Sequence, residues 1–280
     1  SDAAGGVLVN RGALTLEQSL IESGTSVGAG GGLDNGRFKT TTLLNSTFSG
    51  NTAGGLGGGV FLTGGTLNAT NVTVAENEGT AAPAHEDAGE GSGIYRLSAG
   101  AVNLNNTLLA AQVNGANCGG TISHDATVAD DASCSVSAST PPLVDMLADN
   151  GGPTRTHALA ALSAAVDAGD DSLAGALATD QRGVGFPRVI GASVDVGAYE
   201  AGDTDGIAAS GEDSVSDPDG NGFGDGNGDG LADREQSHVA SLGTMVGGDL
   251  ATIETAGAVS PLENVSAEPR PSDAPSNIFF

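Results

Sequence analysis

The chain has 280 residues, of which 46 are glycine and only 3% are aromatic. Its 9 basic and 35 acidic residues give a formal net charge of −26. Nucleic acid and anionic membrane surfaces are therefore disfavoured as partners, because both would repel the chain. No run of about 18 apolar residues occurs, so the sequence predicts no membrane-spanning helix.

Residues 1–114 contain an internal repeat. Each of four segments begins with glycine and an apolar pair, continues with a short middle run and closes on a polar residue followed by alternation. In the second segment Asp34 breaks the apolar pair. The closing polar residues recur at intervals of 27, 26 and 35 residues, and they are Gln18, Asn45, Asn71 and Asn106. The long third interval holds an insertion, residues 79–90, that predicts a loop outside the repeat.

Short β-like runs between Gly and Asn corners favour a parallel β-solenoid, in which each turn adds a strand to each of about three sheets. Equivalent residues should then stack. One expected inward row is Val7, Leu33, Val60 and Ile94. A second is Leu20, Thr47, Thr73 and Leu108.

The corner residues Asn45, Asn71 and Asn106 should adopt a left-handed backbone and form an amide ladder. A β-sandwich is the alternative fold. Its hairpins would require regular two-residue Asn-Gly turns, and only Asn35-Gly36 and Asn114-Gly115 occur.

Cys118 and Cys134 are the only two cysteines. Their close spacing in a Gly-, Ser- and Asp-rich region predicts one local disulfide, and hence an oxidising compartment. The alternative is two free, small core residues. The four histidines are scattered without metal-ligand spacing, so the sequence predicts no zinc site.

Two motifs resemble known surface proteins. Phe48-Ser49-Gly50-Asn51 and Gly58-Gly59-Val60-Phe61 are similar to the FxxN and GGA-type repeats of polymorphic outer-membrane proteins and related bacterial β-helices. Residues 117–134, 147–159 and 165–200 resemble the terminal region of β-helix proteins of the choice-of-anchor Q type. Together these resemblances cover residues 1–201 and imply a secreted, surface-displayed, right-handed parallel β-helix.

A solenoid end exposes strand edges and needs a cap, and the Ala- and Leu-rich stretch 159–166 is the expected cap. Four charged residues flank the apolar runs that follow: Asp180, Arg182, Asp195 and Glu200. We interpret them as a buried ion-pair cluster that fixes the cap. A catalytic group is the alternative.

The composition changes at Gly202, and residues 202–236 are rich in Asp and Gly. The pattern Asp225-x-Asn227-x-Asp229-Gly230 matches the start of a calcium-binding loop, although position 12 is Gln236 and not Glu. The segment resembles a thrombospondin type 3 repeat, with a flexible acidic linker as the alternative. The predicted Ca²⁺ ligands are Asp217, Asp219, Asn221, Phe223, Asp225, Asn227, Asp229, Leu231, Asp233 and Glu235.

Residues 237–280 alternate like strands and resemble the start of choice-of-anchor U β-sandwich domains, but they are too few to close a sandwich. Both ends of the chain are therefore expected to be open, either within a longer chain or against a neighbouring subunit. Head-to-tail self-association would then use the apolar residues Ile278, Phe279 and Phe280.

The sequence thus predicts an all-β protein: a right-handed parallel β-helix with a cap (1–201), a calcium-binding linker (202–236) and a partial sandwich (237–280). The predicted function is structural and not enzymatic, as a secreted adhesin stalk or fibre subunit at the cell surface. A polysaccharide-binding or polysaccharide-cleaving β-helix is the alternative. Its candidate residues share one turn of the repeat, and they are Asp34, Arg37 and Lys39.

Overall fold

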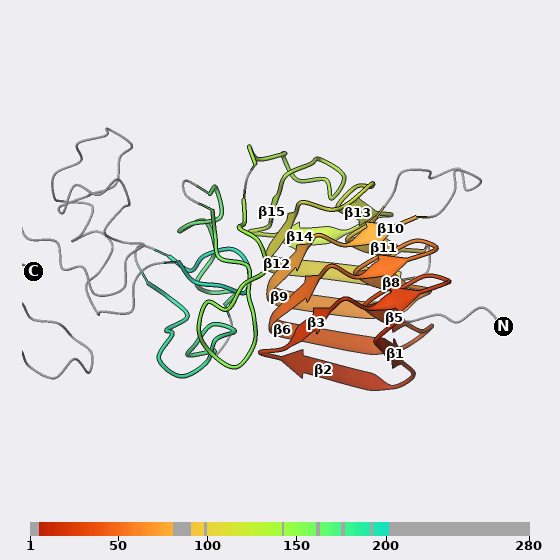
Figure 1. The fold of residues 1–280 in the computed structure, drawn as a ribbon, viewed down its shortest axis with the longest axis horizontal. Helices are drawn as coiled ribbons and strands as arrows, with labels where there is room; N and C mark the ends of the chain where they lie inside the picture. The colour runs from red at the N-terminus through yellow and green to blue at the C-terminus, as the bar shows by residue number, and fades with distance from the viewer. Residues whose placement is uncertain are drawn as a thin grey trace, which may run out of the picture.

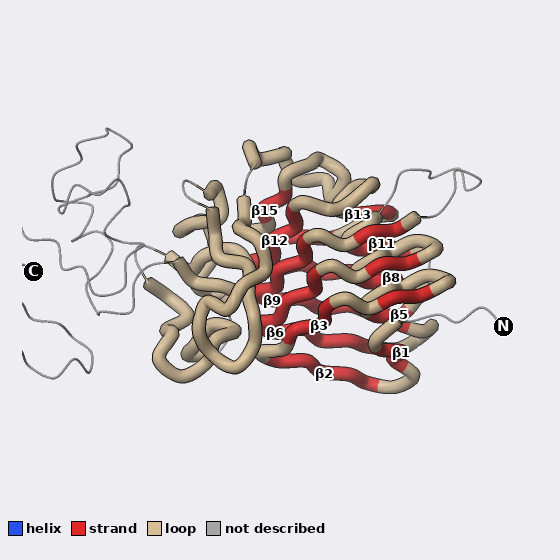
Figure 2. The backbone as a smooth tube through the Cα atoms, viewed as in Figure 1, coloured by secondary structure: helices blue, strands red, loops and turns tan. Residues whose placement is uncertain are grey.

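The computed structural model describes residues 6–80, 91–97, 100–141, 143–160, 163–174, 177–190 and 193–201. These residues contain β-strands and no helix (Figure 2). All pairings within the three sheets are parallel, and successive strands of a sheet come from successive repeats, so the strands stack as rungs (Figure 1). The predicted all-β, parallel architecture is confirmed in this form, which is compatible with a β-solenoid.

Within the described residues, the strands form three sheets, of which the third has strands only in the first three rungs. Sheet A has the order β1 (Leu8–Asn10), β5 (Leu33–Asn35), β8 (Val60–Leu62), β11 (Ile94–Arg96) and β13 (Cys118–Gly119). Sheet B has the order β14 (Ser123–Asp125), β12 (Gly100–Ala110), β9 (Gly65–Ala75), β6 (Thr40–Ser49) and β2 (Ala13–Glu17), with β3 (Leu20–Glu22) beside β6 and β15 (Val128–Ala129) beside β12. Sheet C contains β4 (Thr25–Ser26), β7 (Thr52–Ala53) and β10 (Glu78–Gly79).

The interior of the stack is filled by aliphatic rows. In sheet A, Leu33 lies opposite Val60, Val60 opposite Ile94, and all three side chains are buried. The first member of this row is Leu8, which lies opposite Leu33. The prediction that Val7 belongs to this inward row was wrong, since its side chain is 48% exposed. A shift of one residue along a strand moves a side chain to the other face of the sheet.

The second predicted row has the expected register but faces outward. Leu20, Thr47, Thr73 and Leu108 do lie opposite one another. However, Leu108 packs with Leu143 and Val196, far along the chain, and not with the interior of the stack. The interior is filled instead by the next residues along the strands: Ile21, Phe48, Val74 and Leu109.

Bends in the long strands of sheet B explain this reversal. Asn45, Asn71 and Asn106 have positive φ values of 42°, 53° and 45°, as predicted, and each interrupts the pairing of its strand. The left-handed backbone at each asparagine turns the strand, and this changes which side chains point inward after the bend. Of the predicted amide ladder, the structure contains the link from Asn106 Nδ2 to Asn71 Oδ1, at 3.1 Å.

The described residues between 143 and 201, here called the C-terminal segment, lie along the outer face of sheet B. In Figure 1 this green-to-cyan segment runs beside the whole stack of strands from β2 to β12. It therefore covers a side of the stack, and the predicted position over an end was wrong. The physical reason is the outward row of Thr47, Thr73 and Leu108, which provides a partly apolar surface that must be covered.

Candidate functional site

The predicted disulfide is present. Cys118 and Cys134 are bonded, with a sequence separation of 16, and both are buried. The bond ties β13, the last strand of sheet A, to the loop that follows β15. It therefore fastens the last rung of the stack.

The other predicted sites lie outside the described residues. This applies to the Ca²⁺ ligands between Asp217 and Glu235 and to the assembly residues 278–280. Within the ranges that the structure describes, no group of three or more His, Cys, Asp and Glu side chains could hold a metal ion.

The C-terminal segment is attached to every corner residue of sheet B. Gln18 Nε2 donates to the carbonyl oxygen of Asp180 at 2.8 Å. The three corner asparagines use their Nδ2 groups in the same way, on the carbonyl oxygens of Thr179, Ala174 and Asp170. The segment thus crosses four rungs and hydrogen-bonds to each.

His157 makes a further buried contact between the segment and the stack. Its Nδ1 lies 2.7 Å from the carbonyl oxygen of Asp145, which can only accept, so Nδ1 carries the proton. Nε2 then accepts from the hydroxyl of Ser49 at 2.8 Å. Burial lowers the pKa of His157 below its usual value, so the neutral ring fits this position.

The predicted charged residues do gather in one buried cluster. Arg182 donates from Nε and Nη2 to the same carboxylate oxygen of Asp180, at 2.9 and 2.6 Å. Glu200 accepts from Arg188 Nη2 at 2.5 Å, and Arg188 also donates to Asn45 Oδ1 in sheet B. Asp195 accepts the backbone N–H groups of Asp167 and Ala201.

Burial controls the ionisation of the cluster. Desolvation raises the pKa of Asp195 to about 7. It also raises the pKa of Glu200 to about 9, with a further contribution from the charge of Asp195 and an opposing one from Arg188. The cluster therefore holds protons at pH values where ordinary carboxyl groups have lost them.

Arg188 is the member of the cluster that sequence reasoning missed. Its side chain is almost fully buried and joins Glu200 to sheet B. The sequence does contain an indication of this residue. In Phe186-Pro187-Arg188-Val189-Ile190, one arginine lies inside an apolar run.

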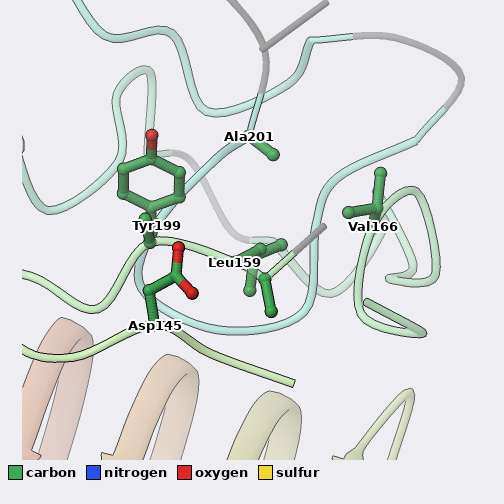
Figure 3. A pocket seen from close by; sticks show the side chains of 7 residues that line it. Asp145, Leu159, Val166, Tyr199 and Ala201 are labelled. Carbon is green, nitrogen blue, oxygen red and sulfur yellow. The ribbon is translucent and has the colours of Figure 1, made fainter. Parts of the chain in front are cut away.

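A small cavity of about 170 Å³ lies within the C-terminal segment (Figure 3). Its lining is mainly alkyl, from residues that include Leu159, Val166 and Ala201. Two polar side chains also line it, Asp145 and Tyr199. Burial raises the pKa of the Tyr199 hydroxyl, so that group stays protonated at neutral pH. The Tyr199 ring also stacks on Arg182, whose Cζ lies 3.9 Å from the ring centroid.

The residues of the alternative, polysaccharide-directed hypothesis lie away from this cluster. Asp34 is in β5 and its side chain is 8% exposed, with Oδ1 lacking a hydrogen-bond partner. Burial raises its pKa, and the charge of Arg11 opposes that effect. Arg37 and Lys39 follow β5 in the turn that leads to sheet B.

Comparison with protein-family models, curated proteins and solved structures finds no match for the chain. In the part of the chain that the structure describes, no helix is long and apolar enough to cross a membrane.

Proposed function

We propose that the protein is a structural extracellular protein whose residues 6–201 form a right-handed parallel β-helix. It serves as an adhesin stalk or as the subunit of a fibre. The observation that carries this proposal is the attachment of the C-terminal segment to four successive rungs through Gln18 and the corner asparagines.

This attachment suits a load-bearing element. In a stack of repeats each rung contacts only its neighbours. The least stable rung therefore limits the stability of the whole stack. A segment that crosses the rungs couples distant ones directly. Gln181, for example, accepts from Thr47 at 2.6 Å, and Ala198 donates to Thr73 at 2.9 Å.

The buried charges support a structural role in preference to catalysis. Arg182 and Arg188 each bond to an acidic side chain, and the oxygens of Asp195 and Glu200 accept backbone N–H groups. A catalytic acid or base must reach a substrate, whereas these groups bond to one another and to the backbone.

Three further features belong to the same proposal. The disulfide supports an oxidising, extracellular location. Residues 202–236 would bind Ca²⁺ and stiffen the connection to the rest of the chain. Residues 278–280 would join one subunit to the next.

Negative-stain electron microscopy of the purified protein tests the proposal. We expect rods, isolated for a stalk and end-to-end filaments for a fibre subunit. In the second case, deletion of residues 272–280 should abolish filaments and leave rods. A matched control deletes residues 81–88, within the insertion that interrupts the repeat, and should leave filaments intact. Compact particles without a long axis would contradict the structural proposal, and filaments that survive deletion of 272–280 would contradict assembly through that end.

A further inference from the structure

Within the described ranges, the basic side chains that form no ion pair lie at one corner of the stack. Four basic residues lie at or beside the turns between sheet A and sheet B, here called the basic corner: Arg11, Arg37, Lys39 and Arg96. In the described part of the chain, the other three arginines each pair with a carboxylate. No ion pair within those ranges engages the basic corner.

The surroundings of the basic corner are poor in acidic residues. The segments that build sheet A, these turns and the first half of sheet B contain three, which are Asp34 and the last residues of β2 and β14, Glu17 and Asp125. The segments are residues 6–17, 30–44, 57–70, 91–97, 100–105 and 118–125. The whole chain carries 35 acidic residues, so this surface has a local charge opposite in sign to the net −26. Charge complementarity therefore points to an anionic partner.

An exposed aromatic side chain lies between two of the cations. Phe38 follows Arg37 and precedes Lys39, and its side chain is 85% exposed. The guanidinium carbon of Arg37 lies 5.4 Å from the centre of the Phe38 ring. Phe38 also has a φ of 60°, an uncommon backbone conformation for a bulky residue. The turn thus holds an aromatic ring out in solvent, with the Arg37 guanidinium close to it.

Rows of uncharged hydrogen-bonding groups adjoin the basic corner on the outer face of sheet B. Thr42 lies opposite Asn68, Asn68 opposite Asn103, and Asn103 opposite Ser123. Thr40 and Thr66 begin a second row. The Nδ2 group of Asn103 donates to Asn68 Oδ1 at 2.9 Å, which holds these amides in a line. The spacing between rungs is about 4.8 Å, so the rows present regularly spaced hydroxyl and amide groups.

We propose that the basic corner and these rows bind an anionic polysaccharide whose acidic groups are sugar carboxylates. Arginine is suited to carboxylates because its planar guanidinium can donate two parallel hydrogen bonds. The Phe38 ring offers an apolar face to the C–H groups of a sugar ring, and Thr and Asn side chains match sugar hydroxyls. This site goes beyond the structural role, since it gives the stack a ligand of its own.

The observations favour this partner over a second copy of the chain. An acidic face of another copy would provide partners only for the cations. It would leave the exposed Phe38 and the rows of hydroxyl and amide groups without a chemical counterpart. A polyhydroxylated acidic polymer uses all three features.

Affinity electrophoresis in gels that contain alginate, a polymer of uronic acids, tests the proposal. Chelator is included so that Ca²⁺ cannot bridge alginate to the acidic residues of the chain. We expect alginate to retard the wild-type protein and neutral dextran to leave its mobility unchanged. The double variant Arg37→Gln/Lys39→Gln should weaken binding about tenfold, as expected for loss of two exposed charge contacts. Phe38→Ala should weaken it about threefold, and Asp34→Asn should strengthen it, because it removes an opposing charge that interacts with Arg11.

Arg155→Gln is the matched control, since Arg155 is also exposed but pairs with Glu22 away from the basic corner. Its affinity for alginate should equal that of the wild type. Equal unfolding temperatures for all variants would establish that the fold is retained. The proposal is overturned if alginate does not retard the wild type, or if Arg155→Gln weakens binding as much as the double variant. It is also overturned if the double variant keeps its affinity for alginate but sediments as a smaller species, which would assign the surface to a second copy of the chain.

Discussion

Asn51 and Asn77 lie at equivalent positions of successive rungs, and Asn51 Nδ2 donates to Asn77 Oδ1 at 2.9 Å. Asn77 Nδ2 in turn donates to the carbonyl oxygens of Phe48 and Ala75. Gln112 continues the row one rung later and bonds to Asn77. Both asparagines are fully buried, so these hydrogen bonds replace the ones that the same groups make with water in the unfolded chain. A buried polar group left without a partner would lower the stability of the fold.

Asn77→Ala should therefore destabilise the protein by about 3 kcal/mol, because several buried N–H and C=O groups lose their partner at once. Asn68→Ala is the matched control. Asn68 is half-buried on the outer face of sheet B and bonds to Asn103, so its loss should cost less than about 0.5 kcal/mol. Urea unfolding measures both, and equal losses would contradict a special role for the buried row.

The buried carboxyl groups should make stability depend on pH. Asp195 and Glu200 keep protons in the folded protein up to about pH 7 and about pH 9, whereas the unfolded chain releases them near pH 4. The contribution of Asp195 is therefore lost between about pH 4 and pH 7, and that of Glu200 between about pH 4 and pH 9. His157 has a lowered pKa and is largely neutral in both states above pH 7, so the range from pH 7 to pH 9 reports mainly on Glu200.

We expect the free energy of unfolding to fall between pH 7 and pH 9.5 by on the order of 1 kcal/mol per pH unit. Asp195→Asn removes the negative charge that raises the pKa of Glu200, so the decline above pH 8 should become shallower. Asp125→Asn, at an exposed position, should leave the decline unchanged. Stability that is constant or rises over this window would rule out a protonated Glu200 in the folded protein.

At the scale of the elements, the disulfide acts on one rung. It links Cys118 in β13 to Cys134 across a short loop, and β13 pairs with β11 alone. The rungs below it are held by their own ladders, such as the ten paired positions between β12 and β9. Loss of the bond should therefore loosen the last rung more than the centre of the stack.

The double variant Cys118→Ala/Cys134→Ala should lose about 3 kcal/mol of stability, the value expected for a loop of this length. Amide hydrogen exchange should accelerate in β13, β14 and β15, while amides of β6 and β9 keep their protection. Reduction of the wild type should reproduce this pattern. Acceleration that is uniform along the chain would show that the bond instead stabilises the stack as a whole.

The periodic part of these elements was predictable from the sequence, and the non-periodic part was not. Repetition of glycine and apolar pairs identified the rungs and the register of Leu33, Val60 and Ile94. It could not fix which side chains point inward after the bend at Asn45, because the left-handed backbone there reverses the alternation. The C-terminal segment has no period at all. Its contacts, including those of Arg188, follow from folding onto sheet B and leave no pattern along the chain.

At the scale of the whole molecule, charge is distributed unevenly. The described ranges combine a basic corner and a buried charged cluster, whereas the sequence from 203 to 235 contains ten Asp and Glu residues. Such a density of carboxylates is self-repelling unless cations neutralise it. Alternating Asp, Asn and Gly residues supply the oxygen ligands and tight turns that Ca²⁺ requires.

We therefore expect Ca²⁺ to order this segment without changing the stack. Limited proteolysis should cut within residues 203–235 in chelator and be slowed by added Ca²⁺, with Mg²⁺ less effective because it demands a stricter octahedral geometry. Asp225→Asn/Asp229→Asn should abolish the protection, since both residues belong to the best match to a calcium loop. The exposed pair Asp149→Asn/Asp171→Asn loses the same two charges outside the segment and should retain it. Cleavage that is equally fast with and without Ca²⁺ would refute calcium binding. Protection that survives in Asp225→Asn/Asp229→Asn would place the ion on other ligands.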